Sequence, residues 1–298
     1  MSLRMLKQQP ERIQVLVKNV EYRQRPSGEE FTQLEVADFT GCATLRWWRD
    51  WGFDYFPGEG DVVEGIVTPR RLDGRLWLDT NWLEPTAEDE RLLRGPAFLS
   101  RNDVPESAHP SLEKLVAIFN GIQEKSLRTF LGRVFTDPGI STRFVRCRAS
   151  ANHHHREPGG LLTHSVGVAE RCSSNGSGLE RSKHELVIAA ALLHDIGKLE
   201  TVGEGPKRPA LAPWVHHEAL TLEILAPHLR WLDGEWPHGA ALLRHCLTWY
   251  STKPAGFAGF VGADILRAMD GIDVGIGMGK GSGEARYEPF RASMRLKA

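Results

Sequence analysis

The sequence lacks the features that mark secreted, disulfide-bonded and membrane-spanning proteins. No apolar run in its 298 residues approaches the roughly 18 residues that a membrane-spanning helix needs. The first residues, MSLRMLKQQPERIQ, contain no apolar stretch of the kind found in secretion signals. The few cysteines show no CxxC pairing; they are Cys42, Cys147, Cys172 and Cys246. We therefore expect reduced cysteines in the core of a cytoplasmic protein that has no membrane partner.

The chain also lacks an excess of charge of either sign. With 37 Lys and Arg against 38 Asp and Glu, its formal net charge is −1. No overall electrostatic field therefore attracts a polyanion, so any binding of nucleic acid has to depend on local basic clusters. Hydrophobic residues make up 41% and charged residues 25% of the chain, as is typical of a globular protein with a core.

Histidine is nearly absent from the N-terminal part of the chain. Of 12 histidines, 11 lie between residues 153 and 245, and only His109 lies outside that range. Any chemistry that uses histidine therefore belongs to the later part of the chain.

Short alternating runs, separated by turn residues, fill the first part of the chain. Such alternation predicts strands, and it occurs at residues 13–20, 30–38, 42–48, 62–68 and 76–83. The segment RLDGR between the last two runs carries a hairpin signal. Five short strands of this kind indicate a small closed barrel or a sandwich.

A cluster of aromatic residues and arginines lies around the third and fourth predicted strands. Its members are Trp47, Trp48, Trp51, Phe53, Tyr55, Phe56, Arg46, Arg49, Arg70, Arg71 and Arg75. Exposed aromatic rings stack on the bases of single strands, and nearby cations hold the phosphates. We expect a single-stranded nucleic acid to contact Trp47, Trp48, Arg70 and Arg71. The alternative is that part of the aromatic residues form core or domain contacts and that the arginines are solvated.

Helical spacing of apolar residues begins at residue 111. It predicts two helices within 111–135, followed by helices that begin near residues 160, 182, 216, 239 and 259, with no strand between them. The expected organisation is a barrel at 12–85, a polar linker at 86–111, an all-α domain at 112–272 and a Gly-rich, flexible tail at 273–298.

The segment ALLHDIGK at residues 191–198 carries the clearest sign of chemistry. His194 and Asp195 are adjacent near the end of an apolar helix, where burying both is costly without a partner. A divalent cation is the simplest such partner. Adjacent helical residues point about 100° apart, so the pair reaches one metal only where the helix ends, or else it bridges two metals.

Further histidines and aspartates occur about once per helix, as a site in the core of a helical bundle requires. They are His164, His216, His217, His245 and Asp264. A mixture of imidazole and carboxylate without thiolate suits manganese, iron, magnesium or nickel better than a structural zinc ion.

These motifs resemble the HD-domain metal phosphohydrolase superfamily. The barrel, the linker, the segment NHHHREPGGLLTHS at 152–165, ALLHDIGK and the later His and Asp are similar to the YhaM-type 3′-to-5′ exoribonuclease family over roughly residues 12–272. The HD domain of conjugative relaxases shares the GGLLxHS stretch, which raises DNA as a substrate. The resemblance implies a multidomain α+β protein, with a five-stranded OB-like β-barrel followed by an all-α HD domain.

The resemblance also implies a role for each matching position. The implied metal ligands are His164, His194, Asp195 as the bridge between two metals, His217 with His216 as the alternative, His245 and Asp264. The family shows paired histidines near the position of His245, where this chain has one. The resemblance implies that His154 and His155 contact the substrate phosphate or orient ligands, whereas we expect His153 to be an exposed loop residue.

A pair of metals would explain hydrolysis of a phosphodiester. Two cations about 3.5–4 Å apart lower the pKa of a bridging water and stabilise the attacking and leaving oxygens. We expect two divalent ions, with manganese favoured and iron, magnesium, nickel or cobalt as alternatives. Lys198, one turn after Asp195, could hold a phosphate oxygen during catalysis, or could be a solvated lysine at a helix end.

Three functions agree with these patterns. The first is a metal-dependent phosphodiesterase acting on single-stranded nucleic acid, expected to be a 3′-to-5′ exonuclease with RNA favoured over DNA. The second is an HD phosphohydrolase of nucleotides or cyclic dinucleotides. The third is a nucleic-acid-binding or mobilisation accessory protein with a non-catalytic HD site. The complete ligand set favours an enzyme, and a homo-oligomer is compatible with all three.

Overall fold

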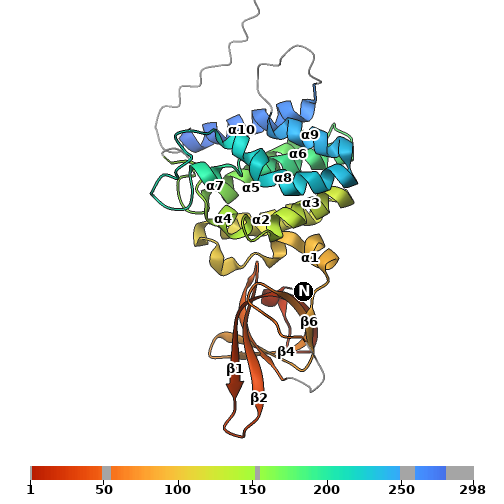
Figure 1. Cartoon of the computed structure of the whole chain (residues 1–298), viewed down its shortest axis with the longest axis vertical. Helices are drawn as coiled ribbons and strands as arrows, with labels where there is room; N and C mark the ends of the chain where they lie inside the picture. The colour runs from red at the N-terminus through yellow and green to blue at the C-terminus, as the bar shows by residue number, and fades with distance from the viewer. Residues whose placement is uncertain (1, 49–54, 152–154, 249–258, 280–298) are drawn as a thin grey trace, which may run out of the picture.

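The N-terminal part of the chain forms a β-sheet. The computed structural model describes residues 2–48, 55–151, 155–248 and 259–279 (Figure 1). The strands are β1 (Glu11–Gln24), β2 (Glu30–Asp38), β3 (Gly41–Trp47), β4 (Val62–Leu72), β5 (Arg75–Thr80) and β6 (Leu83–Pro85). The fifth predicted strand is divided, because the Thr80 hydroxyl accepts the Trp82 N–H at 3.1 Å and the chain turns there. Its last residue, Leu83, begins β6, which pairs with β4.

The strand pairings form a closed ring. β1 pairs antiparallel with β2 and with β4, and β2 pairs antiparallel with β3. β3 runs parallel to β5, and β5 pairs antiparallel with β4, which completes the ring. Alternate side chains of each strand point to opposite faces, and one face encloses an apolar core that includes Val15, Leu34, Leu45, Trp47 and Leu78.

The later part of the chain is helical, as its apolar spacing predicts. The helices are α1 (Glu88–Arg94), α2 (His109–Gly121), α3 (Lys125–Thr136), α4 (Ser141–Arg146), α5 (Gly160–Asn175), α6 (Arg181–Leu193), α7 (Lys198–Thr201), α8 (His217–Glu235), α9 (Pro237–Leu247) and α10 (Val261–Gly279). The described residues after position 111 contain no strand. None of the described helices is long and apolar enough to cross a membrane.

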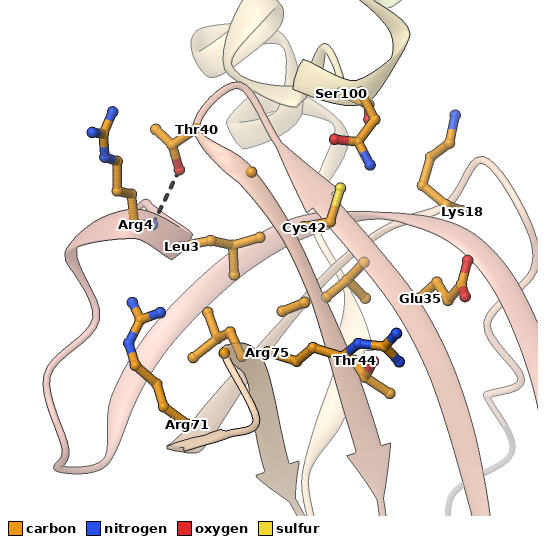
Figure 2. A pocket seen from close by; sticks show the side chains of 16 residues that line it. Leu3, Arg4, Lys18, Glu35, Thr40, Cys42, Thr44, Arg71, Arg75 and Ser100 are labelled. Carbon is orange, nitrogen blue, oxygen red and sulfur yellow. Dashed lines mark hydrogen bonds between the residues drawn. The ribbon is translucent and has the colours of Figure 1, made fainter.

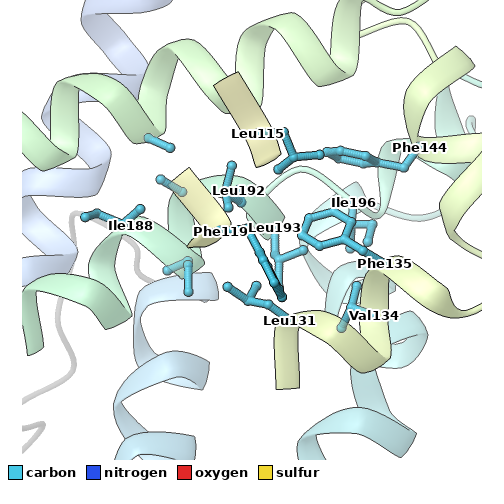
Figure 3. Close-up of a cluster of buried hydrophobic side chains, with 14 of the residues drawn as sticks. Leu115, Phe119, Leu131, Val134, Phe135, Phe144, Ile188, Leu192, Leu193 and Ile196 are labelled. Atoms are coloured by element: carbon cyan, nitrogen blue, oxygen red, sulfur yellow. The ribbon is translucent and has the colours of Figure 1, made fainter. Parts of the chain in front are cut away.

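Helix α6 lies at the centre of the helical part. Every residue from Glu185 to Leu193 is buried, so the helix packs against neighbours on all sides. Figure 3 shows Leu192 and Leu193 of α6 among aromatic side chains of α2, α3 and α4, which include Phe119, Phe135 and Phe144. This burial brings the residues that follow Leu193 into the interior of the molecule.

Residues 86–111 are structured rather than an extended linker. They contain α1 and the short 3₁₀ helices η2 (Gly95–Phe98), η3 (Arg101–Asp103) and η4 (Glu106–Ala108). Leu99 and Val104 are buried in the helical core, because the apolar residues of this segment outweigh its polar composition. At its other side the segment contacts the sheet, where Asp103 lies 2.8 Å from Lys18.

Helix α10 extends beyond the domain end predicted at residue 272. It continues to Gly279, so that Asp273, predicted to belong to a flexible tail, is buried within a helix. Residues 280–298 of that predicted tail lie outside the described residues.

The cysteines are free thiols in two environments. Cys147, Cys172 and Cys246 are buried, and burial raises the pKa of each thiol to about 12. Cys42 is exposed, contrary to its predicted place in the core. Its neighbours Ala43 and Gly41 differ in burial from it, since successive side chains of β3 alternate between the two faces of the sheet.

Candidate metal centre

The end of α6 brings His194 and Asp195 to the same point. The helix ends at Leu193, and the following turn is closed by bonds from Ile196 N to Leu193 O (3.1 Å) and from Lys198 N to Asp195 O (2.9 Å). Adjacent side chains on a regular helix diverge by about 100°, whereas here His194 Nε2 lies 3.4 Å from Asp195 Oδ2. The turn therefore allows both residues to face one cation.

Helix α5 contributes His164 to this point. The side chain is 1% exposed, and its Nε2 lies 3.3 Å from His194 Nε2 and 3.2 Å from Asp195 Oδ2. The possible ligand atoms of His164, His194 and Asp195 all lie within 4.8 Å of one another, as one bound cation requires. We call these three residues the HD cluster.

Helix α8 contributes His217 from the opposite side of Asp195. His217 Nε2 lies 2.9 Å from Asp195 Oδ1, whereas Oδ2 faces His164 and His194. The two oxygens of one carboxylate therefore point to two different sets of nitrogens, as in a carboxylate that bridges two cations. His216, the alternative considered from the sequence, is exposed at the N-cap of α8.

Helix α10 contributes Asp270 rather than Asp264. Asp270 Oδ1 lies 3.2 Å from His164 Nε2 and 3.6 Å from His194 Nε2. Asp264 is exposed in the first turn of α10 and is not brought to the HD cluster. Six residues turn a helix by about 240° beyond a full turn, so Asp264 and Asp270 lie on different faces. The buried positions Ala263 and Leu266 share the face of Asp270, and this spacing was the signal available in the sequence.

His245 is not brought to the HD cluster either. It lies half-buried on α9, a helix that packs against α6 and α8. The groups of three possible metal ligands among the described residues do not include it. Its predicted part in binding a second metal remains a prediction.

Lys198 belongs to the cluster rather than to the solvated surface. Its Nζ lies 2.5 Å from Asp195 Oδ2, and its side chain is 17% exposed. The ammonium group therefore balances part of the carboxylate charge of Asp195.

Gly197 allows α8 to approach the turn that carries the HD cluster. A Cβ atom at this position would lie 1.8 Å from the His217 backbone oxygen, so no side chain fits. Thr221 of α8 connects the two elements, since its hydroxyl accepts from Gly197 N (3.0 Å) and donates to His194 O (3.1 Å). The glycine of the HDIGK segment thus places His217 beside Asp195.

The charges of the cluster fit a divalent cation. Burial alone would lower the pKa of His164, but hydrogen bonds to Asp195, Asp270 and Asp273 raise it to about 11. Burial alone would raise the pKa of Asp195, but the neighbouring imidazoles and Lys198 hold it well below its usual range. The buried carboxylates thus hold a positive charge at His164 Nε2, which a metal ion in the same place would replace.

The loop before α5 places His155 next to Asp273, on the side of His164 that faces away from the HD cluster. Its backbone has a positive φ of 53°, and its Nε2 lies 3.3 Å from Asp273 Oδ2. A Cβ atom at Gly160 would lie 2.0 Å from the His155 backbone oxygen, so the glycine lets this loop close on α5. The adjacent His153 and His154 lie outside the described residues.

The residues predicted to bind a nucleic acid strand lie on both faces of the β-sheet. Trp47 is 1% exposed and belongs to the core, so it is not available to contact a nucleic acid. Trp48 lies on the outer face, stacked near Phe31 at 4.8 Å between ring centroids and 4.1 Å from the Arg25 guanidinium. Arg70 and Arg71 are exposed, as predicted for contact residues.

The outer face also presents residues that the sequence did not single out. Trp77 of β5 lies 5.2 Å from the Arg46 guanidinium, which in turn lies 5.9 Å from the ring of Trp48. We call Phe31, Trp48, Trp77 and Arg46 the aromatic face. Their regular alternation with buried residues along β2, β3 and β5 was a usable signal.

A cleft of about 700 Å³ lies next to the aromatic face on β2 and β3. Figure 2 shows Lys18 at one side of the cleft and Arg71, near the end of β4, at the other, with Arg75 at the start of β5 between them. Among the described residues that line the cleft, Glu35 is the acidic one. The cleft is therefore suited to a ligand of negative charge.

The geometry of the HD cluster agrees with a known family. Residues 161–256 match the family model of the HD domain. The match covers 96 of the 298 residues and lies within the helical part of the chain. HD domains form a superfamily of metal-dependent phosphohydrolases that bind divalent metals, and this match supports a hydrolase at that coarse level. Asp270 and Asp273 lie outside the matched part of the HD domain, and no curated protein matches the chain.

Proposed function

We propose that the protein is a metal-dependent phosphodiesterase that hydrolyses single-stranded nucleic acid, as a 3′-to-5′ exonuclease with RNA favoured over DNA. The observation that carries the hydrolytic part is the meeting of His164, His194 and Asp195 within reach of one cation. The HD domain supports it, since the superfamily consists of phosphohydrolases.

Each residue of the site has a defined part in this proposal. A bound divalent cation would supply Lewis-acid activation of water and of the phosphoryl oxygen. His164, His194, Asp195 and Asp270 would hold it, and His217 faces the second oxygen of Asp195, where another cation would be bridged. The ammonium group of Lys198, which contacts Asp195, would bind a nonbridging phosphate oxygen.

The aromatic face supports a single strand as the substrate. We propose that the closed ring of strand pairings is a small OB-like barrel. Trp48 and Trp77 offer rings for base stacking, and Arg46 lies between them. The basic cleft is lined by Thr44, the strand partner of Trp77, and would hold backbone phosphates.

A second exposed ring lies near the metal centre. Trp214 is 83% exposed and precedes His217 by three residues. Three residues of chain span at most about 11 Å, so this ring lies close to the site. The exposed Lys207 and Arg208 belong to the same segment. We propose that Trp214 stacks on the base next to the scissile bond.

The alternative of nucleotide or cyclic-dinucleotide hydrolysis is favoured by one observation. Arg46 and Arg70 both lie close to Asp79, at 2.8 and 3.5 Å, which reduces the positive charge available to a strand. The same HD cluster would then act on a small phosphate ester. A non-catalytic HD site is disfavoured, because the buried carboxylates are assembled at the cost of their hydration.

The decisive experiment incubates the protein, loaded with manganese, with 5′-labelled RNA and DNA oligonucleotides. We expect a ladder that shortens from the 3′ end, no cleavage by Asp195→Ala or Asp270→Ala, and cleavage by Asp264→Ala. The proposal fails if neither oligonucleotide is cut in the presence of manganese, iron, magnesium, nickel or cobalt.

A parallel assay distinguishes a single-stranded nucleic acid substrate from a small phosphate ester substrate. Trp48→Ala is expected to reduce cleavage of oligonucleotides while leaving hydrolysis of bis(p-nitrophenyl) phosphate unchanged. Unchanged activity toward both substrates would remove the aromatic face from the proposal.

A further inference from the structure

The ring of His164 has different partners at its two nitrogens. Nε2 faces the HD cluster, 3.2 Å from Asp195 Oδ2. Nδ1 faces away from it and lies 2.8 Å from Oδ2 of Asp273, a buried residue of α10. The outer nitrogen of this ligand is thus bonded to a carboxylate that is not one of the family-matched residues.

Asp273 is itself held from two further directions. Arg171 NH1 lies 2.7 Å from Asp273 Oδ1, and His155 Nε2 lies 3.3 Å from Oδ2. Arg171 follows His164 by two turns of α5, so both side chains project from the same face toward α10. The Arg171 guanidinium offsets part of the negative charge of Asp273, and the two contacts fix the orientation of the carboxylate.

Gly167 makes room for this arrangement. It lies on α5 between His164 and Arg171, and a Cβ atom there would lie 3.1 Å from both Arg171 NH1 and Asp273 Oδ1. That distance is shorter than an ordinary van der Waals contact. The ion pair is therefore packed directly against the backbone of the helix that carries the ligand.

A second cation site is the competing interpretation of the same residues. The possible ligand atoms of His155, His164 and Asp273 lie within 4.8 Å of one another. The Arg171 guanidinium, however, already places a permanent positive charge at hydrogen-bond distance from Asp273. A cation added beside it would be repelled, so a hydrogen-bonded network explains the geometry better.

We propose that Asp273, fixed by Arg171, is a positioning residue that orients His164 for metal binding. Its carboxylate accepts the Nδ1–H of His164, which leaves the lone pair of Nε2 directed at the cation and prevents rotation of the ring. Carboxylates in this relation to a histidine ligand typically contribute about 10–100-fold to metal affinity. The inference depends on the metal centre of the proposed function, and it assigns a role to Asp273, which lies outside the HD match.

The test measures binding of Co²⁺ to the full-length protein by competition with a chelator. We expect Asp273→Asn to weaken Co²⁺ binding by about 10–100-fold. Arg171→Gln should weaken it less, and the double variant should lose less than the sum of the two single losses because the residues act together. Arg267→Gln, at an exposed position of the same helix, is the control, with unchanged affinity expected.

Two further readouts distinguish positioning from a general loss of structure. The ¹⁵N resonances of His164 in the Zn²⁺-loaded protein should report the Nδ1–H tautomer, and Asp273→Ala should abolish its hydrogen-bonded shift. Thermal unfolding of each metal-free variant shows whether it is folded, and Asp273→Asn provides the near-isosteric change if Asp273→Ala does not fold.

The outcomes separate this inference from the proposed function. Equal Co²⁺ affinity of Asp273→Asn and the unaltered protein overturns the positioning role, whether or not nucleic acid is cleaved. Tight Co²⁺ binding that Asp273→Asn weakens, without cleavage of any oligonucleotide, supports positioning and overturns the proposed substrate. Absence of Co²⁺ binding by the unaltered protein overturns both.

Discussion

Trp47 and Trp48 are adjacent in the chain but lie on opposite faces of the sheet. Trp47 is buried in the core, whereas Trp48 lies against Phe31 and Arg25 on the outer face. His216 and His217 differ in the same way, since only the second reaches Asp195. At the scale of the residue, one position along the chain therefore decides between core and site.

The two tryptophans should respond differently to truncation. Trp47→Ala removes a fully buried ring and is expected to lower the free energy of unfolding by about 3–5 kcal/mol. Trp48→Ala should leave the protein folded and weaken binding of a single-stranded oligonucleotide by about 1–3 kcal/mol. Urea denaturation and fluorescence anisotropy measure the two effects. Equal effects of both variants on stability would contradict the assigned faces.

His228 should make stability depend on pH. It is 6% exposed on α8, with Nε2 at 3.0 Å from Asp137 Oδ2. Burial lowers its pKa, opposed by Asp137 and assisted by Arg133. The unfolded state therefore binds more protons between the folded pKa and about 6.5, so the free energy of unfolding should fall as the pH decreases below about 6.5.

The measurement compares urea denaturation of the unaltered protein and His228→Gln from about pH 7.5 to about pH 5. The difference between the two stability curves isolates His228 from the other titrating groups. We expect the variant to lose less stability at the acid end. Parallel curves would show that the pKa of His228 is not lowered on folding.

Residues from four parts of the helical region, rather than from a single helix, build the candidate metal centre. His164 comes from α5, the HD segment from the end of α6, His217 from α8 and Asp270 from α10. The motifs on α5, α6 and α8 could be predicted because their spacing is local. The contribution of α10 was missed: its apolar spacing places Asp270 on the buried face, but that spacing does not show which residues the face packs against.

Close contact between the HD turn and α8 should make Gly197 intolerant of a side chain. Gly197→Ala would put a Cβ atom 1.8 Å from the His217 oxygen. We expect the change to lower the free energy of unfolding by about 1–3 kcal/mol and to weaken metal binding, because α8 has to move. Chelator competition and denaturation measure both effects.

Gly234 provides the matched control on α8. Nothing lies within 4 Å of a Cβ atom built there. Alanine is a better helix former than glycine by up to about 1 kcal/mol, so Gly234→Ala should maintain or increase stability with unchanged metal affinity. A loss of metal affinity in this variant would mean that substitution in α8 acts without close contact.

For the whole molecule, the segment between sheet and helices is part of the helical core. Leu99, Val104 and Ala108 are buried there. Asp103 bonds Arg146 of α4 at 3.1 Å while it also pairs with Lys18 of β1. The segment is thus a structural component of the helical part, and its proline and polar content does not make it flexible.

Truncation should reveal this boundary. A fragment of residues 86–298 keeps the segment and is expected to unfold cooperatively and to bind metal. A fragment of residues 112–298 lacks this segment and should be destabilised. The loss of Leu99, Val104 and Ala108 exposes the apolar surface of the helices that they cover. Thermal unfolding and Co²⁺ binding compare the two. Equal melting temperatures would show that the helical core begins at α2.

The amino-acid sequence by itself determined where most of the strands and helices form, and it pointed to the histidines and aspartate of α5, α6 and α8 that lie together in the structure. Periods of 2 and 3.6 residues show which side chains share a face, and these are local properties. Only the tertiary structure decided which face is buried, and hence Trp48 over Trp47 and Asp270 over Asp264. Burial depends on packing between segments far apart in the chain, which no local pattern contains.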